Sequence, residues 1–268
     1  EHFIASDVSA IVIHTKRVIY MQDNEICTVH ADRFEITTLD KLSVKPEISV
    51  VDWDISAIEK GDFKHFMLKE IFEQPITIGN GFRGRINDQL GTARLGGLNL
   101  PSFELRKIKQ IHLVACGTSF HAALIGKYII EDLARIPVHA EYASEYRYRN
   151  PIIPEETLVF VISQSGETAD TLAAMREAKA KGARVLGITN VVGSTIARES
   201  DGGTYIHAGS EIGVASTKAF TSQVTIMVLL SVLMGRMSVL STVQGMEYIK
   251  ELEAIPAKVE KILALNGQ

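Results

Sequence analysis

Two hydroxyl-rich segments carry the clearest chemical signal in the sequence. Ser163, Ser165 and Thr168 follow one buried apolar run, and Gly117-Thr118-Ser119 follows another. Small hydroxyl side chains and glycine let an anion approach backbone N–H groups closely, and the N-terminus of a following helix favours negative charge. Two such segments after neighbouring strands predict a binding site for an anionic group such as a phosphate.

Each hydroxyl taken alone has a simpler explanation, because Ser and Thr are common helix N-caps. Ser165 and Thr168 are therefore open to both interpretations at this point. Neither segment has the GxxxxGKS/T spacing of a P-loop or the GxGxxG spacing of a dinucleotide site, so a nucleoside triphosphate is disfavoured.

A third segment, from Glu211 to Lys218, precedes a long apolar helix. Its small residues allow close approach of a ligand to the backbone, and Ser216 or Thr217 could cap the helix. Glu211 is an acid/base candidate, although a solvated loop carboxylate is the simpler interpretation. Lys218 in the first helical turn faces an unfavourable dipole, which indicates a tertiary role.

Cysteines and histidines give weaker signals. Cys116 is a conceivable nucleophile, but no base adjoins it in the sequence, and a buried or ligand-flanking thiol is the simpler interpretation. Cys27 is expected in the core of a strand. The two cysteines fit neither a disulfide framework nor a zinc spacing. The following histidines share no metal-ligand spacing and are expected to be ordinary surface or core residues: His14, His30, His65, His112, His121, His139 and His207.

The elements that must position these residues alternate between short apolar strands and helices. Continuous apolar strands separated by helices indicate a parallel sheet covered on both faces. We therefore expect an α/β fold, with a three-layer α/β/α domain from about residue 100 to 240. The strands are expected at 111–115, 138–141, 158–162, 184–189 and 203–208, and the helices at 120–134, 142–148, 169–181 and 216–234.

The flanking segments have a different character. Residues 1–50 are β-rich, with strands expected at 10–14, 18–21, 25–30 and 34–39, and we expect them to be the edge of something larger. Residues 51–99 are expected to be a linker with helices from about residue 55, the last of which ends at Pro75. An amphipathic helix at 246–265 is expected to open a further domain from residue 241. Because the first residue is Glu1, we expect a piece of a longer protein.

Three segments taken together resemble one enzyme family: Ala115-Cys116-Gly117-Thr118-Ser119, residues 163–171 and residues 211–220. Residues 65–75 and 143–148 fit it as well. It is the family of isomerising glutamine:fructose-6-phosphate aminotransferases, the glucosamine-6-phosphate synthases. The SxSGxT pattern alone marks only a sugar isomerase (SIS) domain, whereas the combination is specific, and the likeness covers essentially the whole chain.

The resemblance implies a division of labour along the chain. Residues 1–50 would be the C-terminal tail of a glutaminase domain, residues 100–240 the first of two SIS domains, and residues 241–268 the start of the second. The first SIS domain would bind fructose 6-phosphate. The residues that match phosphate contacts are Ser119, Ser163, Gln164, Ser165 and Thr168, and those in the loops around the sugar are Cys116, Gly117, Thr118, Val214 and Ser216.

The same resemblance places the catalytic groups of the family outside this chain. They are an N-terminal cysteine, a base glutamate, a ring-opening histidine and a Schiff-base lysine, and Lys218 does not match that lysine. We therefore expect no catalytic residue here and no activity from this chain alone. The resemblance also implies no metal or organic cofactor, fructose 6-phosphate and glucosamine 6-phosphate as ligands, glutamine only through the missing N-terminal domain, and a homodimer.

Composition limits the alternatives. Lys and Arg number 28 against 32 Asp and Glu, which gives a net charge of −4 without a basic block, so we expect no nucleic-acid partner. The apolar run at 224–234 is too short to span a bilayer, and no signal peptide is evident, so we expect a cytoplasmic protein with no membrane partner. The competing hypotheses are a non-catalytic SIS module that senses a phosphosugar, and a deglycase or phosphosugar isomerase. The glutaminase-like tail disfavours both.

Overall fold

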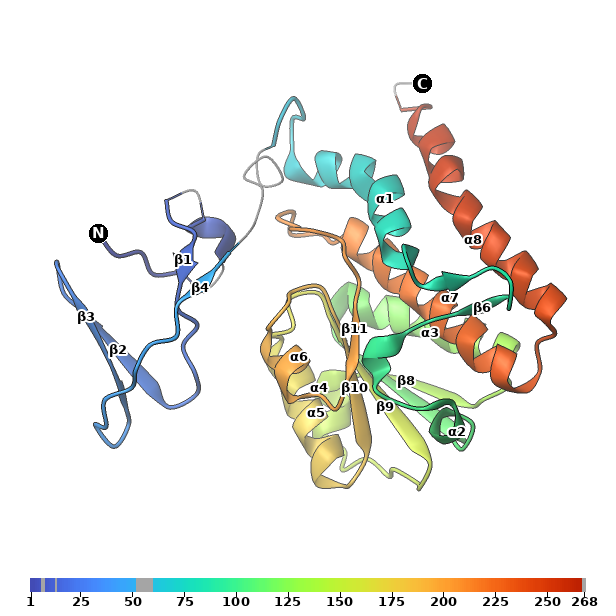
Figure 1. Cartoon of the computed structure of the whole chain (residues 1–268), viewed down its shortest axis with the longest axis horizontal. Coiled ribbons are helices and arrows are strands. Elements are labelled where there is room, and N and C mark those ends of the chain that lie inside the picture. The colour runs from blue at the N-terminus through green and yellow to red at the C-terminus, as the bar shows by residue number, and fades with distance from the viewer. Residues whose placement is uncertain (6–7, 13, 52–59, 267–268) are drawn as a thin grey trace. The chain divides into compact units, whose positions relative to one another are not determined.

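The computed structural model describes residues 1–5, 8–12, 14–51 and 60–266 (Figure 1). The chain divides into two compact units, unit 1 from Glu1 to Asp62 and unit 2 from Phe63 to Gln268. The helix expected to begin near residue 55 falls outside the described residues.

Unit 1 is built from short strands. β2 and β3 form an antiparallel hairpin in which Glu25 lies opposite Thr38, which confirms the two strands predicted there. Asn24 leads into β2 with a φ of 67°, in the left-handed region that suits a turn. β1 pairs with β4 in antiparallel fashion. The elements are η1 (Val8–Ala10), β1 (Arg17–Val18), β2 (Glu25–Val29), β3 (Phe34–Thr38) and β4 (Ser49–Val50).

The predicted strand at residues 10–14 is wrong for the residues that the structure describes. Val8–Ala10 form a 3-10 helix, and the N–H groups of Ile11 and Val12 both donate to the carbonyl oxygen of Val8 at 3.0 Å. Amides that are used within a turn cannot also join a β-ladder. The strand predicted at 18–21 is likewise reduced to Arg17–Val18.

The core position predicted for Cys27 is also wrong, because this residue is exposed. Four successive residues of β2, from Ile26 to Val29, are exposed. β2 and β3 form a sheet of only two strands, and on the face that carries Cys27 the buried residue is its partner on β3, Ile36. A two-stranded hairpin buries little surface, so most side chains of β2, Cys27 included, remain in contact with solvent.

Unit 2 is organised around a parallel sheet of five strands in the order β11-β10-β9-β7-β8. Every neighbouring pair is parallel, which confirms the α/β prediction. β11 is shorter than predicted and ends at Tyr205. The strands are β7 (Gln110–Ala115), β8 (Val138–Tyr142), β9 (Thr157–Ser163), β10 (Arg184–Thr189) and β11 (Gly203–Tyr205).

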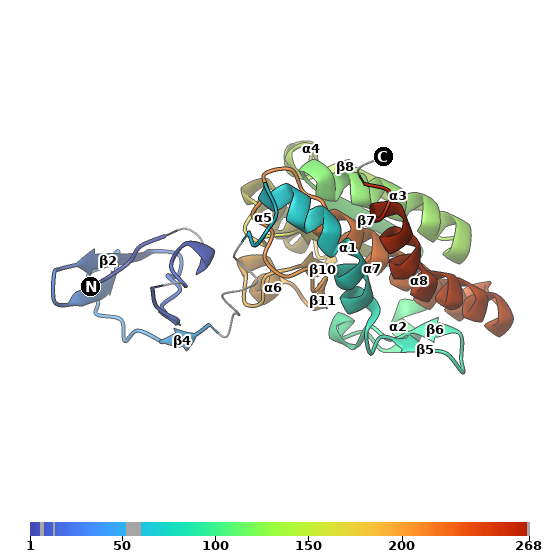
Figure 2. The same cartoon turned by 90° about the horizontal axis from the view of Figure 1, so that it is seen from above.

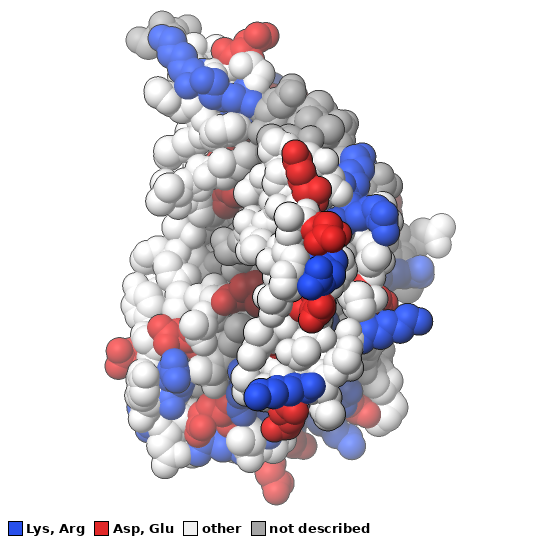
Figure 3. Space-filling view, turned by 90° about the vertical axis from the view of Figure 1, so that its left-hand side faces the viewer, with Lys and Arg blue, Asp and Glu red and all other residues white. Residues whose placement is uncertain are grey.

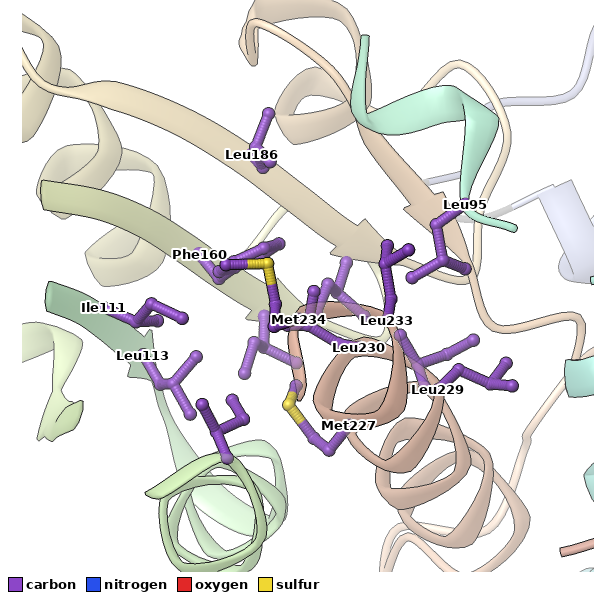
Figure 4. Close-up of a cluster of buried hydrophobic side chains, with 14 of the residues drawn as sticks. Leu95, Ile111, Leu113, Phe160, Leu186, Met227, Leu229, Leu230, Leu233 and Met234 are labelled. Atoms are coloured by element: carbon purple, nitrogen blue, oxygen red, sulfur yellow. The ribbon is translucent and has the colours of Figure 1, made fainter. Parts of the chain in front are cut away.

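Helices cover both faces of this sheet, so the predicted three layers are present. α3 (Gly117–Ala134) and α7 (Lys218–Ser238) lie on one face, where Leu113 and Phe160 pack with Met227 (Figure 4). On the other face, alternate strand residues such as Val159 and Val161 pack with α4 (Ala143–Tyr148), α5 (Ala169–Ala180) and α6 (Thr195–Glu199). The alternation of partners along each strand is the two-residue period of a pleated strand.

α7 is long and apolar enough to cross a membrane by length and composition alone, with a mean hydropathy of 1.5 in its most apolar stretch. In unit 2, however, 72% of that stretch is buried, and the helix packs on the sheet and on α3. The burial identifies α7 as a core helix of this fold.

The remaining elements of unit 2 flank this three-layer body. α1 packs against α7 and α8, and the three helices lie side by side in both views (Figures 1 and 2). β5 and β6 form a short antiparallel hairpin. The elements are α1 (Phe66–Phe82), β5 (Ile86–Asn87), β6 (Thr92–Ala93), η3 (Gly96–Leu98), α2 (Ser102–Leu105) and α8 (Thr242–Leu263).

The prediction that Pro75 ends a helix is wrong, because α1 continues through it to Phe82. Proline has no N–H, so the carbonyl oxygen of Ile71 loses its usual partner four residues later. The side chain of Gln74 takes that place, and its Nε2 donates to the Ile71 oxygen at 3.0 Å. With that acceptor satisfied, the helix continues past the proline.

Candidate functional site

The two hydroxyl-rich loops lie beside each other at the carboxyl edge of the sheet. β7 and β9 are neighbours, and Ala115 at the end of one lies opposite Ile162 near the end of the other. Residues 116–119 and 163–168 therefore leave the sheet at the same edge. In open parallel sheets, this edge is where ligands bind.

The loop at 163–168 is organised by the hydroxyl of Ser163, which is 3% exposed. Its Oγ lies 2.9 Å from Thr168 Oγ1 and 3.4 Å from Ser165 Oγ. It also accepts the backbone N–H of Gly166 at 3.0 Å. Three hydroxyls and an amide are thus gathered in one turn, with Ser163 beneath and the partly exposed Ser165 and Thr168 nearer to solvent.

Helix capping does not explain these two hydroxyls. Thr168 occupies the N-cap position of α5, but its side chain makes no capping hydrogen bond and contacts Ser163 instead. Ser165 Oγ accepts the N–H of Glu167 at 3.2 Å, which is a bond within the turn. Both side chains therefore make hydrogen bonds within the loop instead of capping the helix.

Gly166 is required by the geometry of this loop. Its φ is 70°, and a Cβ placed on it would lie 2.0 Å from Ser194 Oγ. The close approach lets the Gly166 oxygen accept the N–H of Ile196 at 3.0 Å, while Glu167 Oε1 accepts the N–H of Thr195 at 2.7 Å. The first turn of α6 thereby holds the loop at 163–168 in place through these two hydrogen bonds.

The loop after β7 carries the other predicted residues. Cys116 is partly buried at the N-cap of α3, and Thr171 Oγ1 donates to its Sγ at 3.9 Å. Gly117 and Thr118 are exposed, whereas Ser119 is buried. The contact with Thr171 links this loop to the first turn of α5, and hence to the loop that Ser163 organises.

Sequence analysis missed Gln223, which belongs to this site. It is 1% exposed in α7, and its Nε2 donates to Ser119 Oγ at 2.9 Å. Because that bond uses a lone pair of the Ser119 oxygen, the serine keeps its own O–H to donate elsewhere. No local motif marks Gln223, since it sits 104 positions from Ser119 inside an apolar helix.

The segment from Glu211 to Lys218 is shaped by Glu211 itself. Its Oε1 accepts the N–H groups of Thr217 at 2.8 Å and Ala219 at 3.1 Å. Glu211 thus caps α7 and is more than a solvated loop carboxylate, while its acid/base role stays a prediction. Thr217 occupies the N-cap position without a side-chain capping bond, so the predicted hydroxyl cap is replaced by this carboxylate.

The predicted ligand residues of this segment differ in exposure. Val214 is fully exposed, and Ser216 is partly buried. Lys218 is buried at 4% exposure, and its Nζ donates to Glu73 Oε2 of α1 at 2.7 Å. The tertiary role predicted for Lys218 is therefore confirmed.

Metal-ligand chemistry gives no second site in the described part of the chain. Among the residues that the structure describes, no group of three or more His, Cys, Asp or Glu side chains is arranged to hold a metal ion. On the face shown in Figure 3, Lys and Arg side chains are interspersed with Asp and Glu. The hydroxyl-lined carboxyl edge of the sheet is accordingly the candidate site.

The parallel sheet and its Ser-rich turn lie within a stretch of the chain that matches a known family. Residues 104–233 match the family model described as SIS domain, so the chain carries a SIS domain. The glutamine–fructose-6-phosphate aminotransferase (isomerising) of Chlorobaculum tepidum is 50% identical over 99% of this chain. The enzyme of that name from Bacteroides thetaiotaomicron is 46% identical over 100% of this chain.

A solved structure agrees with these sequence relatives. The C-terminal domain of glucosamine-fructose-6-phosphate aminotransferase from Francisella tularensis has a TM-score of 0.72 and 40% identity, covering 77% of this chain and 58% of that one. The chain spans 43% and 44% of the length of the two curated relatives. The resemblance drawn from sequence motifs is thus confirmed for the stretch that this chain covers.

Proposed function

We propose that this chain is the fructose-6-phosphate-binding part of a glutamine–fructose-6-phosphate aminotransferase, which converts fructose 6-phosphate and glutamine to glucosamine 6-phosphate and glutamate. The observation that carries the proposal is the hydroxyl cluster around Ser163 at the carboxyl edge of the sheet. The relatives named for this activity match the chain from end to end, which supports the same assignment.

The chemistry of the loop suits a phosphate monoester. With Ser163 donating to Thr168 Oγ1, Ser165 and Thr168 each keep an O–H for a charged oxygen. α5 begins at the residue after Thr168, and its first N–H groups have no helical partners. Hydrogen bonds to a charged acceptor are stronger than neutral ones. The Cys116–Ser119 loop and the Val214–Ser216 stretch would then contact the sugar.

The other steps of the reaction belong to the whole protein in this proposal. Release of ammonia from glutamine and the acid/base chemistry on the sugar would use residues outside this chain, so its own residues bind and orient the phosphosugar. We propose further that the protein is a cytoplasmic homodimer that needs no metal or organic cofactor.

Substituting the loop hydroxyls tests the proposal. Each hydroxyl that donates to a charged oxygen is worth about 1.5–3 kcal/mol. Ser165→Ala and Thr168→Ala in the whole protein should therefore weaken fructose 6-phosphate binding by roughly tenfold to a hundredfold, measured by calorimetry. Ser102→Ala is the matched control. Ser102 is exposed at the start of α2, and α2 comes just before the amino end of β7, opposite to the edge that carries the hydroxyl cluster.

Two outcomes would contradict the proposal. One is an unchanged affinity for fructose 6-phosphate in both variants together with a lowered melting temperature, which would make the hydroxyls purely structural. The other is equal affinity of the unsubstituted protein for fructose and fructose 6-phosphate, because an anion cradle must discriminate between them.

A further inference from the structure

Helix α1 lies outside the residues matched to the SIS family, yet its side chains reach the segment that precedes α7. Glu70 Oε1 accepts the backbone N–H of Ile212 at 2.6 Å and that of Gly213 at 3.0 Å. Its second oxygen lies 3.2 Å from the same Gly213 nitrogen. One carboxylate therefore binds two successive amides of residues 211–218, which we call the 211–218 loop.

The burial of Glu70 shows how closely this contact is made. The residue is only 2% exposed, and a buried carboxylate is costly unless hydrogen bonds compensate for its lost hydration. Gly213 makes the approach possible, because a Cβ at that position would lie 2.5 Å from Glu70 Oε2 and 3.4 Å from the Cα of Met67. The contact thus depends on a buried carboxylate in α1 and on a glycine in the 211–218 loop.

The far end of the 211–218 loop is fixed as well. The buried ammonium of Lys218 is paired with Glu73, one turn further along α1 than Glu70. Glu73 Oε1 also lies 3.6 Å from Lys69 Nζ. Carboxylates therefore hold the loop at residues 212–213 and again at 217–219, and Val214 between them is fully exposed.

We propose that Glu70 is a positioning residue for the phosphosugar site. By holding the amides of Ile212 and Gly213, it fixes the backbone that presents residues 214–216 toward the ligand, so α1 is part of the binding machinery. This inference rests on the proposed function, because that function places Val214 and Ser216 beside the sugar.

Two variants of Glu70 in the whole protein test the inference. Glu70→Ala removes both acceptor oxygens and should weaken fructose 6-phosphate binding by about tenfold, the loss of roughly one charge-assisted hydrogen bond. Glu70→Gln keeps one acceptor oxygen and should restore the affinity to within about threefold of the unsubstituted protein. Glu104→Ala is the control, since Glu104 pairs with Arg184 at the amino end of β10.

Gly213→Ala provides an independent route to the same effect. The added Cβ pushes the Glu70 carboxylate away by a change in the loop, while the sequence of α1 stays the same. The loss of fructose 6-phosphate affinity in Gly213→Ala should therefore match that in Glu70→Ala. The double variant should lose little more than either single one, because both remove the same contact. This variant also decides the question if Glu70→Ala fails to fold.

The outcomes separate the inference from the function on which it rests. Affinity that stays unchanged in Glu70→Ala and Gly213→Ala, while Ser165→Ala weakens binding, would overturn the positioning role alone. Unchanged affinity in all three variants would instead contradict the phosphate site itself. Equal weakening by Glu70→Ala and Glu70→Gln, without rescue, would also overturn the positioning role.

Discussion

His112 on β7 is a buried titratable residue on the face of the sheet away from α7. It is 2% exposed, its Nδ1 lies 3.0 Å from the hydroxyl oxygen of Tyr146, and its Nε2 lies 3.0 Å from Gln110 Nε2. Burial first, and then the nearby His139, lower its pKa to about 4. Burial also raises the pKa of the Tyr146 hydroxyl, so both partners are uncharged in the folded protein.

This histidine should make the stability of unit 2 depend on pH. The unfolded chain takes up a proton near pH 6.5 but the folded protein only near pH 4, so the contribution is complete above the higher value and falls as the pH drops between the two. Lowering the pH from 7 to 5 should cost about 2 kcal/mol of unfolding free energy, measured by urea titration at each pH.

A matched pair of variants isolates the effect of His112. His112→Gln should flatten the pH dependence, whereas His121→Gln, at an exposed position on α3, should keep it. The same slope in His112→Gln and the unsubstituted chain would show that other groups carry the pH response.

How far individual site residues could be predicted depends on where their partners lie in the sequence. Ser163, Ser165 and Thr168 form a local turn, so their spacing alone pointed to an anion loop. Gln223 and Glu70 act through contacts with residues more than 100 positions away, and nothing in their own neighbourhoods marks them. Contacts between distant segments depend on packing, which a local pattern does not encode.

Among the secondary-structure elements, α1 shows how a helix tolerates an internal proline. Pro75 is buried in its middle, and Gln74 supplies the donor that the proline lacks. The helix must continue beyond this point to pack on α7 and α8, and Glu70 and Glu73 on its first turns contact the 211–218 loop. A break at Pro75 would remove the second half of that packing.

Removing the Gln74 side chain should therefore destabilise unit 2. Gln74→Ala leaves the carbonyl oxygen of Ile71 without the donor that it has in the structure, at a cost of about 0.5–1.5 kcal/mol. Pro75→Ala restores a backbone N–H four residues after Ile71, so adding Gln74→Ala to that variant should cost clearly less. Unfolding free energies of the four proteins form a double-mutant cycle, and strict additivity would contradict this role of Gln74.

Strand and helix positions in unit 2 were largely predictable, because buried parallel strands are continuous apolar runs. β10 coincides with its predicted range, and α5 ends at Ala180, one residue before its predicted end. The predictions failed where the chain uses local bonds instead of a ladder, as at Val8–Ala10, or supplies a side-chain donor, as at Gln74. Local turn bonds and side-chain donors of this kind produce no periodic pattern of apolar residues in the sequence.

On the scale of the whole chain, the two units have separate apolar clusters. Unit 1 has a small cluster around Val12, Val18 and Val51, and unit 2 has extensive cores on both faces of its sheet. Residues 63–268 alone should therefore fold, with the same cooperative thermal transition that unit 2 shows in the whole chain, measured by circular dichroism. A broad, non-cooperative transition in the shorter protein would show that unit 2 depends on unit 1.

The contact between Glu70 and the amide of Gly213 joins residues 143 positions apart. All five strands of the parallel sheet lie between them along the chain. During synthesis, α1 therefore leaves the ribosome long before either the loop that it binds or the helix on which it packs has been made. Contacts of such long range can form only after the intervening chain has been made, and they form slowly because closing a long loop costs entropy. The carboxylate of Glu70 stays hydrated until then, and the 211–218 loop takes shape late, when nearly all of unit 2 has been made.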